Sequence, residues 1–212
     1  MRTDSAYPVQ SRIAATLAKL LQKVKSVAVF CGSNSGLDPV YAEAANSTGR
    51  LLAERKLLLV YGGGKRGLMG AVADATLAAG GQVHGVITDY LKSRELMHTG
   101  IQHCEVVPDM ALRKHRFADL ADAFLVLAGG VGTLEETSDM WSRAQLGGLR
   151  KPIGIVNTRG FYDPLLAMIE RMIADGFLPE QQKQWLVVAE EPGAVLDALA
   201  GYQVAANVSK WI

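Results

Sequence analysis

Short apolar runs alternate along this chain with longer segments whose apolar positions recur at helical spacing. Seven of the short runs have the length and composition of strands, at residues 26–31, 57–61, 82–87, 104–107, 123–127, 152–156 and 185–188. Most of them lack the polar alternation of a strand with one wet face, as expected when helices cover both faces of a parallel sheet. The pattern therefore predicts a parallel sheet in an α/β protein.

Helices are expected between these strands, near residues 39–54, 67–79, 109–121, 133–146, 163–175 and 192–202. Asp38 followed by Pro39 indicates a helix start, because aspartate caps the first turn and proline suits the first helical position. Gly80 and Gly176 fit helix ends. Strand–helix alternation with right-handed crossovers predicts a doubly wound sheet of about seven strands.

The chain of 212 residues suits a single domain, which we expect over residues 26–212. Residues 1–25 form a predicted N-terminal extension. Within it, Ile13, Leu17, Leu20, Leu21 and Val24 recur at helical spacing. This amphipathic helix is expected to pack on the body of the protein or on a partner subunit.

Composition narrows the class of protein. The net charge is +1 and the basic residues are scattered, so no nucleic-acid partner is expected. No apolar run approaches the ~20 residues that span a membrane, and no secretory signal is evident, so no membrane partner is expected either. The two cysteines, Cys31 and Cys104, fit a reducing compartment, which favours a cytoplasmic location.

Three glycine-bearing loops follow predicted strands, at residues 32–36, 62–70 and 129–133. Ligands of doubly wound sheets bind beyond the carboxyl ends of the strands, so these loops are three candidate walls of one cleft. The second loop contains G-x-G-x-x-G, a weak indication of dinucleotide binding. A dinucleotide site would have an acidic residue about 20 residues after this motif to bind the ribose, and Asp89 lies somewhat beyond that position. Tight turning and close helix–strand packing explain these glycines equally well.

The segment from Gly129 to Glu136 leads from a buried strand into a helix. Such a loop directs backbone N–H groups and the positive end of the helix toward an anion, usually a phosphate. Thr133 and Glu136 also match a capping box, which competes evenly with a catalytic role for Glu136. Glu135 and Glu136 point about 100° apart on a helix, so we expect them to have different roles.

Arg113 lies on a helical stripe otherwise fit for burial, with Met110, Phe117 and Leu120. A buried guanidinium needs an anionic partner, either a protein carboxylate or a ligand. Lys114 points elsewhere, and on pattern alone it is expected in solvent. The four histidines show no metal-ligand spacing, and neither cysteine has a nucleophile signature, so no metal or cofactor is expected.

Arg113-Lys114 followed by the segment Gly129–Glu136 resembles the paired motifs of the Lonely Guy family. These are cytokinin riboside 5′-monophosphate phosphoribohydrolases, often labelled lysine decarboxylases. The resemblance extends from about residue 26 to 190 and covers further short motifs: Cys31–Ser33, Tyr61–Gly64, Gly67–Gly70, Arg94–Leu96, Ala144–Gly147 and Lys151–Gly154.

The resemblance implies a Rossmann-like fold, a homodimer or higher homo-oligomer, and cleavage of the N-glycosidic bond of a purine nucleoside 5′-monophosphate. Arg113 and Glu136 match the family's catalytic pair. The positions that match substrate contacts are Glu95, Lys114, Gly130, Val131, Gly132, Thr133, Leu134, Glu135 and Ser142. Gly129, Gly130, Gly132 and Thr133 would form the phosphate loop.

Two residues depart from the family pattern: Ala128 replaces the proline that precedes the glycines, and Ala111 replaces a histidine before Arg113. Both bear on substrate preference and rate more than on the class of reaction. The alternative function is a nucleotide or molybdenum-cofactor carrier on the same fold, without hydrolysis. Retention of both Arg113 and Glu136 argues against a carrier, because binding alone does not require the acid.

Overall fold

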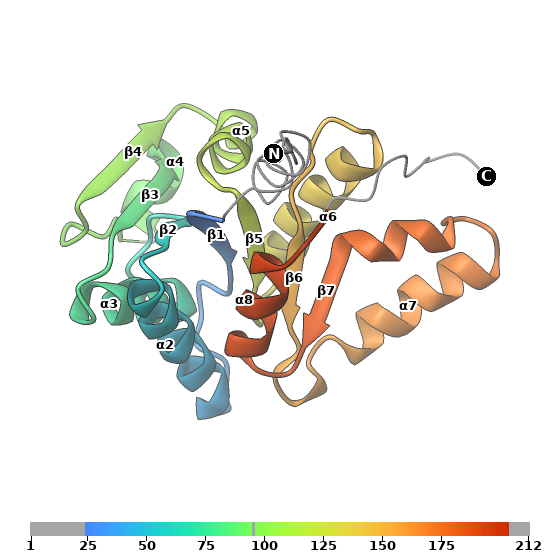
Figure 1. The fold of residues 1–212 in the computed structure, drawn as a ribbon. Helices are drawn as coiled ribbons and strands as arrows, with labels where there is room; N and C mark the ends of the chain where they lie inside the picture. The colour runs from blue at the N-terminus through green and yellow to red at the C-terminus, as the bar shows by residue number, and fades with distance from the viewer. Residues whose placement is uncertain (1–23, 95, 204–212) are drawn as a thin grey trace, which may run out of the picture.

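A computed structural model describes residues 24–94 and 96–203, and these form one seven-stranded sheet with helices on both faces (Figure 1). The strands are β1 Ser26–Phe30, β2 Leu58–Tyr61, β3 Val83–Thr88, β4 His103–Val107, β5 Ala123–Val126, β6 Ile153–Val156 and β7 Leu186–Ala189. The helices are α2 Pro39–Glu54, α3 Gly67–Ala78, α4 Asp89–Arg94, α5 Met110–Leu120, α6 Val131–Gln145, α7 Asp163–Ala174 and α8 Pro192–Ala200. Two 3₁₀ turns, η1 Thr158–Gly160 and η2 Glu180–Trp185, complete the set.

All neighbouring strands pair in parallel, in the order β4-β3-β2-β1-β5-β6-β7. Strand order reverses beside β1: the chain first builds outward through β2, β3 and β4, then returns to add β5 on the other side of β1. The prediction of a doubly wound parallel sheet is confirmed. The crevice between the loops after β1 and β5 is the place where such folds bind ligands.

Each face of the sheet has its own apolar core. Helices α2, α3 and α8 cover one face, where they pack on the side chains of alternate strand residues such as Val27 and Leu125. Helices α5 and α6 cover the other face, where Phe117 and Met140 are fully buried against Phe124. Burial on both faces explains why the strands read as nearly continuous apolar runs.

The helix starts and ends predicted from single residues agree with the structure. The Asp38 side chain accepts a hydrogen bond from the Val40 N–H at 3.0 Å, and Pro39 occupies the first helical position of α2. Gly80 and Gly176 adopt positive φ just beyond α3 and α7, as predicted for helix ends. At the other end of the sheet, the Asp122 carboxylate accepts the backbone N–H groups of Lys25 and Ser26, which ties the start of β1 to the start of β5.

The prediction of an amphipathic helix in the N-terminal extension falls mostly on residues 1–23, outside the described residues, and stays a prediction. The single-domain assignment of residues 26–212 stays a prediction as well. No helix among the described residues combines the length and apolar character needed to cross a membrane. Helix α4, which the sequence reading missed, has only six residues and buries none of them.

Candidate active site

Helix α6 starts earlier than its sequence suggests. Gly130 is the N-cap, no side chain caps the helix, and Thr133 lies inside the first turn. The predicted capping box between Thr133 and Glu136 is therefore wrong. The first turn leaves the N–H groups of Val131, Gly132 and Thr133 without helical acceptors, so they can bind an anion.

The glycines of this loop are not equivalent. A Cβ at Gly129 would lie 2.1 Å from the Thr133 hydroxyl and 2.9 Å from the Gly32 nitrogen, so only glycine fits there. Gly130 and Gly132 face open space, because a Cβ added to either would have no atom within 4 Å apart from its chain neighbours and the nearby backbone of its own helix. Gly129 therefore shapes the loop, whereas Gly130 and Gly132 leave the backbone of the first turn accessible.

Arg113 of α5 is buried, with 4% of its surface exposed. Its Nε donates to the Val86 carbonyl at 2.9 Å and its Nη2 to the Gly62 carbonyl at 3.0 Å, so strand β3 and the loop after β2 hold the guanidinium. The prediction that Arg113 is buried beside an anionic partner is confirmed. Sequence reading missed both carbonyls, although the glycine after β2 was a signal that backbone approaches closely there.

Glu136 of α6 is the partner carboxylate. Its Oε1 accepts from Arg113 Nη1 at 3.3 Å, and its side chain is 12% exposed. The pair lies one helical turn from the open start of α6. A carboxylate and a guanidinium thus meet beside a helix N-terminus that is suited to phosphate.

Lys114 forms a second ion pair between the same two helices. Its Nζ contacts the Glu135 carboxylate and lies 3.8 Å from Asp139 Oδ1. The side chain is only 16% exposed, so the expectation that Lys114 extends into solvent is wrong. The helix stripe could not reveal this, because the partners of Lys114 belong to α6. Glu135 and Glu136 contact different cations, Lys114 and Arg113, and the expectation that their roles differ stays a prediction.

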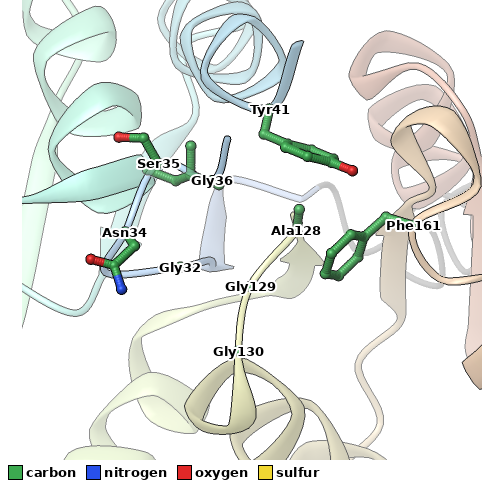
Figure 2. A pocket seen from close by; sticks show the side chains of 10 residues that line it. Gly32, Asn34, Ser35, Gly36, Tyr41, Ala128, Gly129, Gly130 and Phe161 are labelled. Atoms are coloured by element: carbon green, nitrogen blue, oxygen red, sulfur yellow. The ribbon is translucent and has the colours of Figure 1, made fainter. Parts of the chain in front are cut away.

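The three glycine-bearing loops meet at one crevice. The Gly32 N–H donates to the Ala128 carbonyl at 3.0 Å, the Leu68 N–H donates to the Gly32 carbonyl at 3.0 Å, and a Cβ on Gly67 would overlap the Ser33 backbone. Between the loops after β1 and β5 lies a pocket of about 190 Å³. Figure 2 shows Tyr41, Phe161 and Ala128 around this pocket, with Gly129 and Gly130 beside it.

The remaining predicted residues vary in exposure. Val131, at 83%, and Leu134, at 38%, are exposed on the first turns of α6, and Ser142 is exposed further along the same helix. Glu95 lies outside the described residues. Ala111 is exposed at the start of α5.

Two observations bear on other chemistry. Burial raises the pKa of the Cys104 thiol, with Arg113 as an opposing influence, so this thiol is disfavoured as a thiolate nucleophile. Within residues 24–94 and 96–203, no group of three or more His, Cys, Asp or Glu side chains is arranged to hold a metal ion.

Comparisons with known proteins identify the family of this chain. The family model described as possible lysine decarboxylase matches residues 69–199. A cytokinin riboside 5′-monophosphate phosphoribohydrolase of Arabidopsis thaliana is 42% identical over 181 residues, which cover 85% of this chain and 83% of the relative. A probable enzyme of the same name from Oryza sativa subsp. japonica is 42% identical over 180 residues, covering 85% and 79%.

Solved structures share the fold at low identity. A molybdenum cofactor binding protein from Rippkaea orientalis has a TM-score of 0.63 at 18% identity, covering 85% of this chain and 98% of that protein. A structural genomics target, TM1055, has a TM-score of 0.63 at 22% identity, covering 84% and 99%. The identities of the sequence relatives, over most of both chains, settle the family. The chain belongs to the Lonely Guy family, whose family model is described as possible lysine decarboxylase.

Proposed function

We propose that this protein is a phosphoribohydrolase that cleaves the N-glycosidic bond of a purine or cytokinin nucleoside 5′-monophosphate, releasing free base and ribose 5-phosphate. The observation that carries this proposal is the buried Arg113–Glu136 pair beside the open N-terminus of α6. The names of the sequence relatives support the same reaction.

The 5′-phosphate is proposed to bind at the start of α6. Gly129, Gly130, Gly132 and Thr133 form the phosphate loop, with the N–H groups of the first turn as donors. The open space beside Gly130 and Gly132 supports this role, because a phosphate can approach the backbone there. The pocket between the loops after β1 and β5 is lined by Gly129 and Gly130, so it opens beside the proposed phosphate loop.

Glu136 is proposed as the group that acts at C1′. In the reaction the bond between C1′ and the purine nitrogen breaks, water oxygen bonds to C1′, and a proton passes to the leaving base. The sugar becomes positively charged in the transition state, and a carboxylate held nearby stabilises that charge and orients the water. The burial of Glu136 supports this role, since low dielectric strengthens the interaction.

Arg113 cannot act as a general acid, because a guanidinium does not release its proton in proteins. Its proposed role is electrostatic: it holds Glu136 between turnovers and stabilises negative charge on the phosphate or the leaving purine. The carbonyls of Val86 in β3 and of Gly62 after β2 keep it in place.

The neighbouring contacts follow the family assignment. Lys114 and Glu135 are paired at the edge of the site, and they and Ser142 are proposed to contact substrate together with Val131 and Leu134. Glu95 is proposed to accept a hydrogen bond from the exocyclic amine of the purine. No resident cofactor or metal enters this mechanism.

We infer that the protein is at least a homodimer. Helices α5 and α6 carry exposed apolar side chains: Met110 and Leu112 of α5 are each 41% exposed, and Val131 and Leu134 of α6 are 83% and 38% exposed. A second copy of the chain would remove this apolar surface from water. A cytoplasmic location, without nucleic-acid or membrane partners, is proposed with it.

The test is base release. The purified protein is incubated with AMP and with N6-isopentenyl-AMP, and the free base and ribose 5-phosphate are separated by chromatography. Hydrolysis that disappears in the Glu136→Ala variant, while the variant remains folded, is the expected result. A folded wild type that releases no base from either nucleotide, but purifies with a bound nucleotide or cofactor detected by mass spectrometry, would favour the carrier alternative.

A further inference from the structure

The segment that connects α4 to β4 crosses the glycine loop after β2. The Lys65 N–H donates to the Leu96 carbonyl at 2.9 Å, and the His98 N–H donates to the Gly63 carbonyl at 2.9 Å. Gly64 and Met97 form an isolated antiparallel bridge between these two contacts. Two loops at the carboxyl edge of the sheet are thereby joined by backbone hydrogen bonds.

His98 anchors this crossing through its side chain, which is 3% exposed. Its Nδ1 accepts the Gly100 N–H at 3.0 Å, and its Nε2 lies 2.9 Å from Asp74 Oδ1 on α3. Because Nδ1 accepts, the neutral ring carries its proton on Nε2 and donates it to Asp74. Both ring nitrogens are satisfied, which fixes the ring in one orientation.

Leu96, at the start of the crossing, has a φ of 50°. A residue with a side chain is strained in this left-handed region, so surrounding contacts must hold the conformation. The hydrogen bond to Lys65 and the anchored His98 are such contacts. Strain of this kind is concentrated where a protein needs a defined geometry.

The glycine loop held in this way reaches Arg113. The Gly62 carbonyl accepts from Arg113 Nη2 at 3.0 Å, and a Cβ at Gly62 would lie only 2.4 Å from Nη2. A Cβ on Gly63 would lie 3.1 Å from the Ile87 side chain. The loop thus has little space to move, and a change in its position moves an acceptor of the guanidinium.

We propose that His98, anchored by Asp74, is a positioning residue for the Arg113–Glu136 pair. It holds the glycine loop so that the Gly62 carbonyl directs the guanidinium toward the Glu136 carboxylate. Asp74 belongs to α3, the helix that continues the chain from Gly62–Lys65, so the backbone of His98 contacts this segment and its side chain contacts the helix that follows. The kinetic consequence of this inference rests on the proposed hydrolase function.

Three variants test the anchor by kinetics. His98→Asn keeps an acceptor for the Gly100 N–H but cannot reach Asp74, whereas His98→Gln can reach Asp74. Asp74→Asn removes the carboxylate from a side chain that is 60% exposed, so the fold should persist. We expect His98→Asn to lower kcat for base release at least tenfold and Asp74→Asn at least threefold. KM should stay within threefold, because the phosphate loop on α6 is untouched.

His98→Gln should recover at least threefold in kcat over His98→Asn. The matched control is Asp197→Asn on α8. It weakens the ion pair in which Asp197 Oδ1 lies 2.8 Å from Arg55 Nη1, and it should leave kcat unchanged. A rise in KM with unchanged kcat in the His98 variants would overturn the proposal, since that pattern indicates a role in base binding alone.

A spectroscopic measurement separates this inference from the proposed function. The Arg113 Nε–H donates to a buried carbonyl, so its ¹H–¹⁵N resonance should be shifted and protected from exchange. We expect this resonance to move in His98→Asn and Asp74→Asn but not in Asp197→Asn. Unchanged Arg113 signals in folded variants would overturn the positioning role. Absence of base release by the wild type would overturn only the proposed function.

Discussion

Replacing Glu136 by glutamine removes one negative charge while keeping the size of the side chain. The charge faces Arg113 Nη1 at 3.3 Å, and the two side chains are 12% and 5% exposed. At this distance of 3.3 Å and an effective dielectric constant of about 20, the gross attraction is about 5 kcal/mol. Most of that attraction offsets the cost of removing both charges from water.

The net effect on folding is therefore much smaller than the gross attraction. Arg113 keeps its hydrogen bonds to the carbonyls of Val86 and Gly62, so the guanidinium is not left without acceptors. We expect Glu136→Gln to lower the free energy of unfolding by about 1–3 kcal/mol, because the amide oxygen can still accept from Arg113 but the negative charge that strengthens this hydrogen bond is lost. The effect on catalysis should be larger, with kcat lowered about 10²–10³-fold, because the carboxylate acts on charge that develops in the transition state.

Two assays check these numbers: urea unfolding followed by fluorescence, and chromatographic detection of base released from AMP or N6-isopentenyl-AMP. Glu170→Gln is the matched control, because Glu170 pairs with Lys183 on the surface and its side chain is 59% exposed. That control should change the free energy of unfolding by less than about 0.5 kcal/mol and leave kcat unaltered. If Glu136→Gln keeps kcat within tenfold of the wild type, the assigned role of this carboxylate is refuted.

Three further predictions follow from local geometry. Gly129→Ala should destabilise the fold and abolish activity, because its Cβ would overlap the Thr133 hydroxyl. Gly132→Ala, at an open position, should keep the melting temperature and raise KM for the nucleotide. Equal losses of stability in the two variants would contradict this prediction. Lys56 has a φ of 57°, so Lys56→Gly should raise the free energy of unfolding by about 1 kcal/mol in urea titrations, and a decrease would be contrary evidence. Burial, and next the charge of His103, lowers the pKa of His84 below its ordinary 6.5, so the unfolded chain binds the proton more readily. Stability should therefore fall as the pH drops below about 6.5, and His84→Asn should flatten that slope; an unchanged slope would refute the assignment.

The sheet and most of its helices could be predicted because their signals are local. The apolar runs around Val60 and Phe124 are buried on both sides, which makes them continuous in the sequence. Asp38 caps α2 through its own neighbours along the chain. Arg113 was found because it interrupts an apolar stripe, an anomaly visible within one helix.

The errors arose where tertiary contacts outweigh local patterns. Thr133 looked like a helix cap, but its side chain is buried against the chain at Gly129, and the residue at the N-cap is Gly130, three residues earlier. Lys114 looked solvated because its carboxylate partners lie on α6. His98 was considered only with the other histidines as a metal ligand, because its partner, Asp74, lies 24 residues away in the sequence, on α3.

The position of β1 at the centre of the sheet has a consequence for how the site comes into being. Strand β1 pairs with β2, which follows it closely in the sequence, and also with β5, which is nearly a hundred residues away. The hydrogen bond between Ser26 and Asp122 joins residues 96 positions apart. During synthesis, the half of the sheet that carries β1 to β4 can assemble while α6 has not yet been made. The crevice exists only once the second half docks, and such long-range pairing is slow. A ligand that contacts the loops on both sides of β1 would therefore stabilise the docking of two halves of the chain that are made at different times.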